Sequence, residues 1–189
     1  MDSKNLLVID LGHSFSRIAS VSDDGSTLEL IANRDGVYET PSVLAFAEGD
    51  FVLGSHAESL MRSSNENIFP FLRDVLAYPD MPWFPQSSLP YELVAGKKEQ
   101  DYVQIPVLSE SGRKELFSIV ELVTIVCEEL REFALDRLGE KMKRQLSVIF
   151  IVPTGINPKL ASALKASGEN AGFRSSFLVD EALCVLNKL

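Results

Sequence analysis

The sequence predicts an α/β fold, a mixed five-stranded sheet flanked by helices, with an α+β subdomain inserted into it. Three observations support this prediction. A meander of strand-like segments comes first, at residues 5–10, 16–22 and 27–33. Strand and helix patterns alternate after residue 116, as they do in parallel crossover units. Between these two parts, residues 39–115 hold seven of the nine prolines, which indicates a region of different organisation.

The main subdomain comprises residues 1–38 and 116–189. The turn signal Asp23-Asp24-Gly25-Ser26 predicts an antiparallel pair between the second and third strands. A helix over 118–138 follows from apolar residues at helical spacing, a capping box of Ser118 with Glu121, and Gly139 as the stop. Residues 147–152 are apolar on both faces, as a central strand should be.

The last elements are predicted from their caps. Asn157 caps a helix that has Pro158 at its first position and ends at Gly172. Residues 176–180 form another strand, and Asp180 caps a final helix. A three-stranded meander followed by two crossovers is the ribonuclease-H-like layout. Nucleases and actin-like ATPases share this layout, so the topology alone does not decide the chemistry.

The inserted region, residues 39–115, is less regular. We expect strands at 42–47 and 51–54, and then a helix from Ser55, which forms a capping box with Glu58. Residues 79–101 are expected to be irregular. They include the single tryptophan, Trp83, for which anchoring of a loop is favoured over a docking patch.

Composition excludes several classes of function. The 189 residues are 46% hydrophobic and carry a net charge of −9, which argues against nucleic-acid or anionic-membrane partners. The apolar stretch near Val120 is interrupted by glutamates, and no signal peptide is expected, so the sequence predicts a cytoplasmic protein. Cys127 and Cys184 are expected to be buried free thiols of a reducing compartment.

The most informative motif is the apolar run that ends in Asp10-Leu11-Gly12-His13-Ser14. A strand that delivers an aspartate to a glycine turn can hold phosphate on its N–H groups, with the carboxylate facing a hydrated cation. Many strands also end in Asp-x-Gly for turn chemistry alone. A two-metal nuclease would need an acid at the tip of the fourth strand, where Val152-Pro153-Thr154-Gly155 has none. An ATPase would need a carboxylate after the last strand, which Glu181 supplies beside the capping residue Asp180.

Longer segments make a family recognisable. The chain resembles the first lobe of the ATPase domain of the heat shock protein 70 (DnaK) chaperone family from Leu7 to Leu189. The matching segments are VIDLGHSFS (8–16), LIANRDGVYETPSVLAF (30–46), FVLGSHA (51–57), NIFPFLRDVL (67–76), ELVTIVCEELREFALDRLGEKM (121–142) and VIFIVPTGINPKLASALKASGENAGF (148–173). The resemblance implies an actin-like ATPase lobe.

The resemblance also implies roles for particular residues. Asp10, Gly12, His13 and Ser14 occupy the turn that binds the phosphates of ATP or ADP, with Asp10 facing Mg²⁺, but two family threonines are replaced by His13 and Ser14. Glu181 matches a catalytic glutamate. The catalytic lysine falls at Arg73, or at Leu72 if the alignment moves by one residue, and arginine is not equivalent to lysine there.

Two further positions concern allosteric coupling. Pro153 matches the family's switch proline, whereas the arginine that relays its state corresponds to Ala161, so the resemblance implies that this coupling is lost. The other phosphate loop, the adenosine pocket and a further catalytic aspartate belong to the family's second lobe, which the matching segments do not include.

Two hypotheses of function follow. In the first, the chain is half of an ATP/ADP cleft with little or no ATP hydrolysis alone. In the second, it is a non-catalytic interaction module, like the atypical ribosome-associated members that partner a J-domain protein. A nucleotide-exchange factor is another implied partner. A nuclease or sugar kinase has no motif beyond topology. Without a second lobe, we also expect Leu183, Val185 and Leu186 to be partly exposed and to favour self-association.

Overall fold

The computed structural model describes residues 5–22, 24–63, 67–77, 89–96, 102–139 and 145–186, with the backbone alone at 185 and 186. Its main sheet is built from β1 (Leu6–Leu11), β2 (Phe15–Val21), β3 (Leu28–Ile31), β4 (Thr40–Pro41), β10 (Ser147–Val152) and β11 (Ser176–Asp180). Three helices accompany this sheet: α3 (Ile119–Leu138), α4 (Pro158–Asn170) and α5 (Glu181–Leu186).

The strand order of the main sheet is β11-β10-β1-β2-β3, and the short β4 pairs with β2. β1, β10 and β11 run parallel, whereas β2 is antiparallel to both β1 and β3. This is the predicted mixed sheet with the ribonuclease-H-like layout, and the five-stranded path is confirmed. The predicted strands at 147–152 and 176–180 match β10 and β11.

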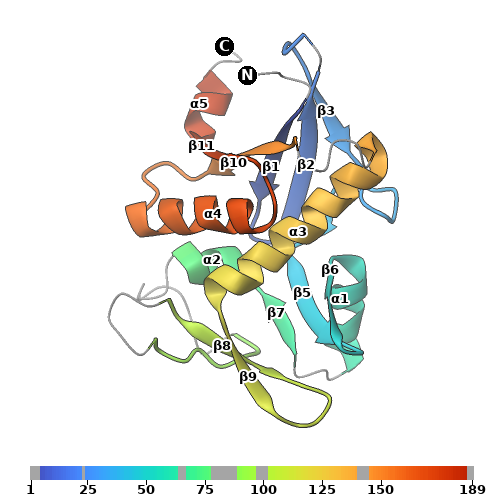
Figure 1. Cartoon of the computed structure of the whole chain (residues 1–189), viewed down its shortest axis with the longest axis vertical. Helices are drawn as coiled ribbons and strands as arrows, with labels where there is room; N and C mark the ends of the chain where they lie inside the picture. The colour runs from blue at the N-terminus through green and yellow to red at the C-terminus, as the bar shows by residue number, and fades with distance from the viewer. Residues whose placement is uncertain are drawn as a thin grey trace.

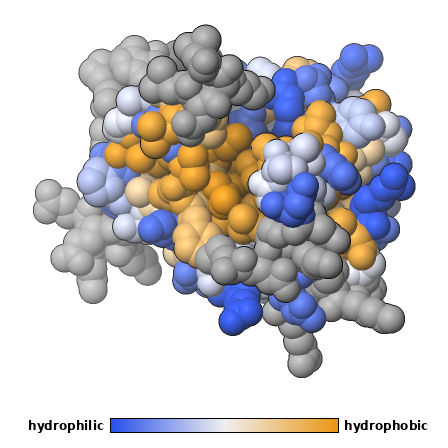
Figure 2. All heavy atoms as spheres, turned by 90° about the horizontal axis from the view of Figure 1, so that it is seen from above, coloured by the Kyte–Doolittle hydropathy of each residue, from blue (hydrophilic) through white to orange (hydrophobic). Residues whose placement is uncertain are grey.

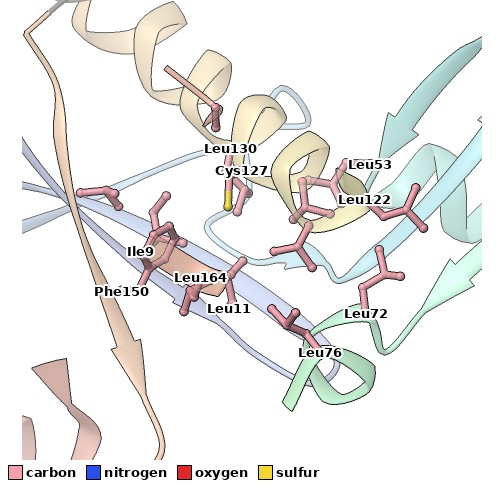
Figure 3. Packing of buried hydrophobic residues seen from close by; sticks show 14 of the residues in the cluster. Ile9, Leu11, Leu53, Leu72, Leu76, Leu122, Cys127, Leu130, Phe150 and Leu164 are labelled. Carbon is pink, nitrogen blue, oxygen red and sulfur yellow. The ribbon is translucent and has the colours of Figure 1, made fainter. Parts of the chain in front are cut away.

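The core lies between one face of the sheet and the helices α3 and α4 (Figure 1). Alternate residues of β1, which are Leu7, Ile9 and Leu11, point to this side and are buried. Figure 3 shows Ile9 and Leu11 near Phe150 of β10 and residues of α3, including Cys127 and Leu130. Burial of this one apolar layer is the main term that stabilises the sheet against its helices.

The opposite face of the sheet carries a row of apolar residues at matching register. Leu30 lies opposite Ala19, Ala19 opposite Val8, Val8 opposite Ile149, and Ile149 opposite Phe177. Leu30 is 54% exposed, and Val8, Ile149 and Phe177 are half-buried. Figure 2 looks onto the end of the molecule that carries α5 in Figure 1 and shows an apolar area there. This face is therefore less covered than the face that packs on α3 and α4.

The predicted inserted region contains two small antiparallel sheets. β5 (Val43–Ala47), β6 (Asp50–Leu53) and β7 (Ile68–Pro70) form one sheet, and β8 (Gln104–Leu108) and β9 (Lys114–Ser118) form the other. The helices are α1 (Ser55–Leu60), the 3₁₀ turn η2 (Met61–Ser63) and α2 (Leu72–Ala77). Figure 1 places these elements beyond α3 from the main sheet, and one cluster of buried residues continues between them. The division at residues 39 and 115 stays a prediction.

The two predicted capping boxes have different outcomes. Ser118 and Glu121 form theirs, with each side chain accepting from the backbone N–H of the other. The prediction at Ser55 was wrong, because Ser55 is already helical and Gly54 is the N-cap without a side-chain hydrogen bond. Gly54 has φ of +87°, and a Cβ there would lie 3.0 Å from the Thr40 methyl carbon. The glycine backbone therefore turns the chain into the helix one residue earlier.

The cysteines also differ from each other. Cys127 is fully buried in α3 as predicted, and this burial raises the pKa of its thiol. Cys184 was expected to be buried but is exposed, because none of the described residues covers its side of α5. Several predictions fall outside the described residues: those for Trp83, for the side chains of Val185 and Leu186, and for residues 79–88 and 97–101 of the expected irregular segment. Among those described, no helix has the length and apolar character needed to cross a bilayer.

Candidate functional site

The turn after β1 is held closed by its glycine. A Cβ on Gly12 would lie 2.1 Å from the backbone oxygen of Phe15, so a side chain cannot be accommodated without opening the β1–β2 hairpin. The N–H of Ser42 donates to the Ser14 carbonyl at 2.8 Å, which ties the turn to the start of the inserted region. The side chains of His13 and Ser14 remain exposed. The turn is therefore tight and needs glycine at position 12, and its role in binding phosphate stays a prediction.

The predicted carboxylates come to one edge of the sheet. Asp10 lies opposite Ile151, and Val152 lies opposite Asp180, so the parallel strands end side by side. Glu181 follows as the first residue of α5 and is exposed. Asp180 is the helix cap, because its Oδ1 accepts from Ala182 N and from Thr154 Oγ1, both at 2.8 Å. Asp180 is thus used as a helix cap, and Glu181 is the exposed carboxylate next to it at this edge.

His13 is held by the inserted region. Its Nδ1 lies 2.6 Å from Oδ2 of Asp74 in α2, and its ring stacks on Phe71 with centroids 4.5 Å apart. The Asp74 side chain is only 9% exposed, whereas the His13 side chain is 58% exposed. Phe71 has φ of +62°, a left-handed conformation that is strained for a residue with a Cβ. Imidazole, phenyl ring and carboxylate thus crowd one side of the turn.

Arg73 also contacts this turn. Its Nη1 donates to the carbonyl oxygen of Leu11 at 3.2 Å, and its Nε lies 3.5 Å from Oδ1 of Asp74. The guanidinium is therefore engaged with the backbone of the turn and with a neighbouring carboxylate. The alternative match for the catalytic lysine, Leu72, is buried and lines a small cavity below the turn.

This cavity, of about 30 Å³, has largely apolar walls. Gly12 and Pro153 form parts of its wall, together with Leu72 from α2 and Leu160 from α4. Pro153, the predicted switch proline, thus lines the same cavity as Gly12, and its allosteric role stays a prediction. The cavity is wide enough for roughly two water molecules, but its apolar walls offer them few hydrogen-bond partners.

Sequence reasoning missed Arg17 and Glu39. Arg17 lies directly opposite Asp10 across the β1–β2 pair, and its Nη1 is 3.4 Å from the Asp10 carboxylate. Its Nη2 donates to Glu39, and this bond is the largest cause of the raised pKa of Arg17. Residues 12–15 connect the last pair of the hairpin, Leu11 and Ser16, and set this register, so pairing the hairpin strands in the sequence could have found the contact.

The residues present do not fit a divalent cation at Asp10. The carboxylate that would face the cation already has a guanidinium partner, and the nearby acid Glu39 shares the same partner. Across the described residues, no group of three or more histidine, cysteine, aspartate or glutamate side chains is arranged to hold a metal ion. A hydrated Mg²⁺ keeps most of its ligands as water, but the guanidinium beside Asp10 would repel its positive charge.

The fold and the turn define a class of protein, a lobe of the ribonuclease-H-like, actin-like ATPase type. Comparison with known proteins gives the family, because the model of the Hsp70 protein family matches residues 6–185. The chain belongs to the Hsp70 family. A relative is the chaperone protein DnaK of Akkermansia muciniphila, 28% identical over 178 residues. This match covers 93% of the chain but 26% of DnaK, so the chain spans about a quarter of that relative's length.

Proposed function

We propose that this chain forms one wall of an ATP/ADP cleft, in a chaperone-family protein of the cytoplasm, and has little or no ATP hydrolysis by itself. The observation that carries the proposal is the Gly12 turn at the ends of parallel strands, with Asp10 and Glu181 at the same edge. Backbone N–H groups at such a turn suit phosphate oxygens. The family match supports a nucleotide as the ligand.

The low rate of ATP hydrolysis that we propose follows from the contacts of Arg73 and from the exposure of the phosphates to water. Arg73 is bonded to the Leu11 carbonyl, and a guanidinium cannot place an attacking water as a compact ammonium would. Contacts from one wall also leave the phosphates open to water, which weakens the electrostatic stabilisation of a transition state. Arg73 and Glu181 remain our candidates for catalytic positions, and Pro153 for the allosteric one.

The test combines phosphate release from ATP with melting temperature in ADP. If ADP binds with a Kd of about 1 mM, a concentration of about 10 mM stabilises the fold by about 1.4 kcal/mol. This gain corresponds to a rise in Tm of about 3–5 °C for a chain of this size. Adenosine is the matched control, since it lacks the phosphates, and we expect it to give no rise. Steady release of phosphate at the rate of a complete family member would contradict the proposal.

A second candidate function is favoured by the internal pairing around the turn. His13 is bonded to Asp74 and Asp10 to Arg17, so two positions expected to face a ligand already have protein partners. These pairs suit an interaction module that keeps the fold and partners a J-domain protein or a nucleotide-exchange factor. An unchanged Tm in ADP, together with binding of a purified J-domain protein, would favour this candidate over the first.

Self-association is a further part of this proposal. Leu183 of α5 is 55% exposed, as predicted, and the row from Leu30 to Phe177 makes the adjoining sheet face apolar. Burial of such surfaces against a second copy would remove them from water. Light scattering should therefore give a mass that rises with concentration, and the variant Leu183→Glu should stay closer to a monomer. A strict monomer at high concentration would contradict this expectation.

A further inference from the structure

The pair of Arg17 and Asp10 differs from an ordinary surface ion pair by its place. Asp10 lies at the carboxyl end of β1, two residues before Gly12 of the tight turn, where a phosphate and its cation would meet in the proposed cleft. Arg17 reaches Asp10 from the neighbouring strand, and Glu39, which precedes β4, holds the guanidinium from the other side. Two elements thus direct one positive charge toward this carboxylate.

The charges decide which ligand can approach. A divalent cation at Asp10 would have to displace the guanidinium or lie beside it, and like charges at this range repel one another. The three side chains are partly exposed, at 37% for Asp10, 43% for Arg17 and 52% for Glu39. Solvent therefore weakens the attraction within each ion pair, but the positive charge of Arg17 still repels a cation at Asp10. The guanidinium also offers planar N–H groups that match phosphate oxygens.

We infer that the Arg17 guanidinium is a resident counter-ion that excludes divalent cations from Asp10, so that this wall takes phosphate groups as free anions rather than as metal complexes. This inference rests on the proposed nucleotide cleft for its ligand class, but the exclusion of the cation can be tested without any nucleotide. Arg17 is thus a specificity-determining residue, with no part in a chemical step.

The test uses Mn²⁺ as the probe and amide signals of the folded chain as the readout. Mn²⁺ should leave the signals of Asp10 and Gly12 sharp in the wild-type protein and broaden them in Arg17→Ser. The apparent Mn²⁺ affinity should rise by about tenfold, the effect of removing one positive charge about 6 Å from a divalent ion in water. The double variant Asp10→Asn, Arg17→Ser should lose this gain, because the carboxylate is then absent.

Arg34→Ser is the matched control. Arg34 is also an exposed arginine with two carboxylate partners, Glu129 and Asp136, but it contacts α3 rather than the turn. Its replacement should leave the Asp10 and Gly12 signals sharp. Circular dichroism confirms that each variant is folded. Equal broadening in the wild type and Arg17→Ser, or none in either, would overturn the inference.

A second readout separates this inference from the proposed function. If ADP binds, its affinity should be equal in Mg²⁺ and in EDTA for the wild type, and at least about tenfold higher in Mg²⁺ than in EDTA for Arg17→Ser. If ADP does not bind, the nucleotide cleft fails, while the Mn²⁺ experiment still decides whether Arg17 excludes the cation. A marked Mg²⁺ dependence in the wild type would overturn the inference alone.

Discussion

Replacing Leu122 with alanine should lower the free energy of unfolding by about 2–5 kcal/mol. Leu122 lies in the first half of α3, is 0% exposed, and belongs to the cluster that joins the main sheet to the inserted region. Figure 3 shows it near Leu53, among buried residues. Its truncation removes apolar contacts and leaves a cavity that the packed neighbours cannot fill completely. Urea unfolding followed by circular dichroism measures the change.

Leu183→Ala is the matched control, because it removes the same atoms from another helix. Leu183 is 55% exposed, so the loss should stay within about 0.5 kcal/mol when it is measured at a concentration that keeps the protein monomeric. Equal losses for the two variants would show that α3 is not packed against the sheet as described.

The two cysteines should react with a thiol reagent at rates that differ by about a thousandfold or more. Cys184 is exposed, whereas Cys127 is fully buried and burial raises the pKa of its thiol, so its reactive thiolate is disfavoured. The reagent reaches Cys127 only when the core opens, and opening of a core helix costs about 5 kcal/mol or more. Absorbance of the released aromatic thiol gives both rates.

Cys184→Ser provides the control for this assignment. The variant should show no fast phase under native conditions and one thiol after denaturation in guanidinium. Rapid modification of Cys184→Ser in the native state would mean that α3 is open on the minute timescale. Both experiments together therefore examine the same helix through its packing and through its opening.

The strand ends of the site could be predicted from sequence, since they depend on local signals. An apolar run that stops at Asp10 fixes the position of the carboxylate, and Gly12 fixes the turn. The order of strands then brings Glu181 to the same edge, because parallel strands end together. These inferences need only the chain's own periodicity and the handedness of crossovers.

The contacts across the turn could not be predicted in this way. The bond of Arg73 to Leu11 and that of His13 to Asp74 join residues more than sixty positions apart, and their geometry depends on where α2 packs. The helix α2 was missed, because residues 72–77 are too few for a clear helical period. The exposure of Cys184 depends on which side of α5 packs against another element, and an apolar pattern in the sequence does not predict that side.

The left-handed backbone of Phe71 has a consequence for how the surroundings of the Gly12 turn respond to mutation. A residue with a Cβ is disfavoured at φ of +62°, whereas glycine accepts this conformation readily. The ring of Phe71 can stack on His13 only at the cost of this backbone strain, and neighbouring contacts must offset that cost. Replacement of Phe71 by glycine would relieve the backbone strain, but it would also remove the ring on which His13 stacks. The conformational preference of the backbone and the placement of the imidazole therefore favour different residues at position 71.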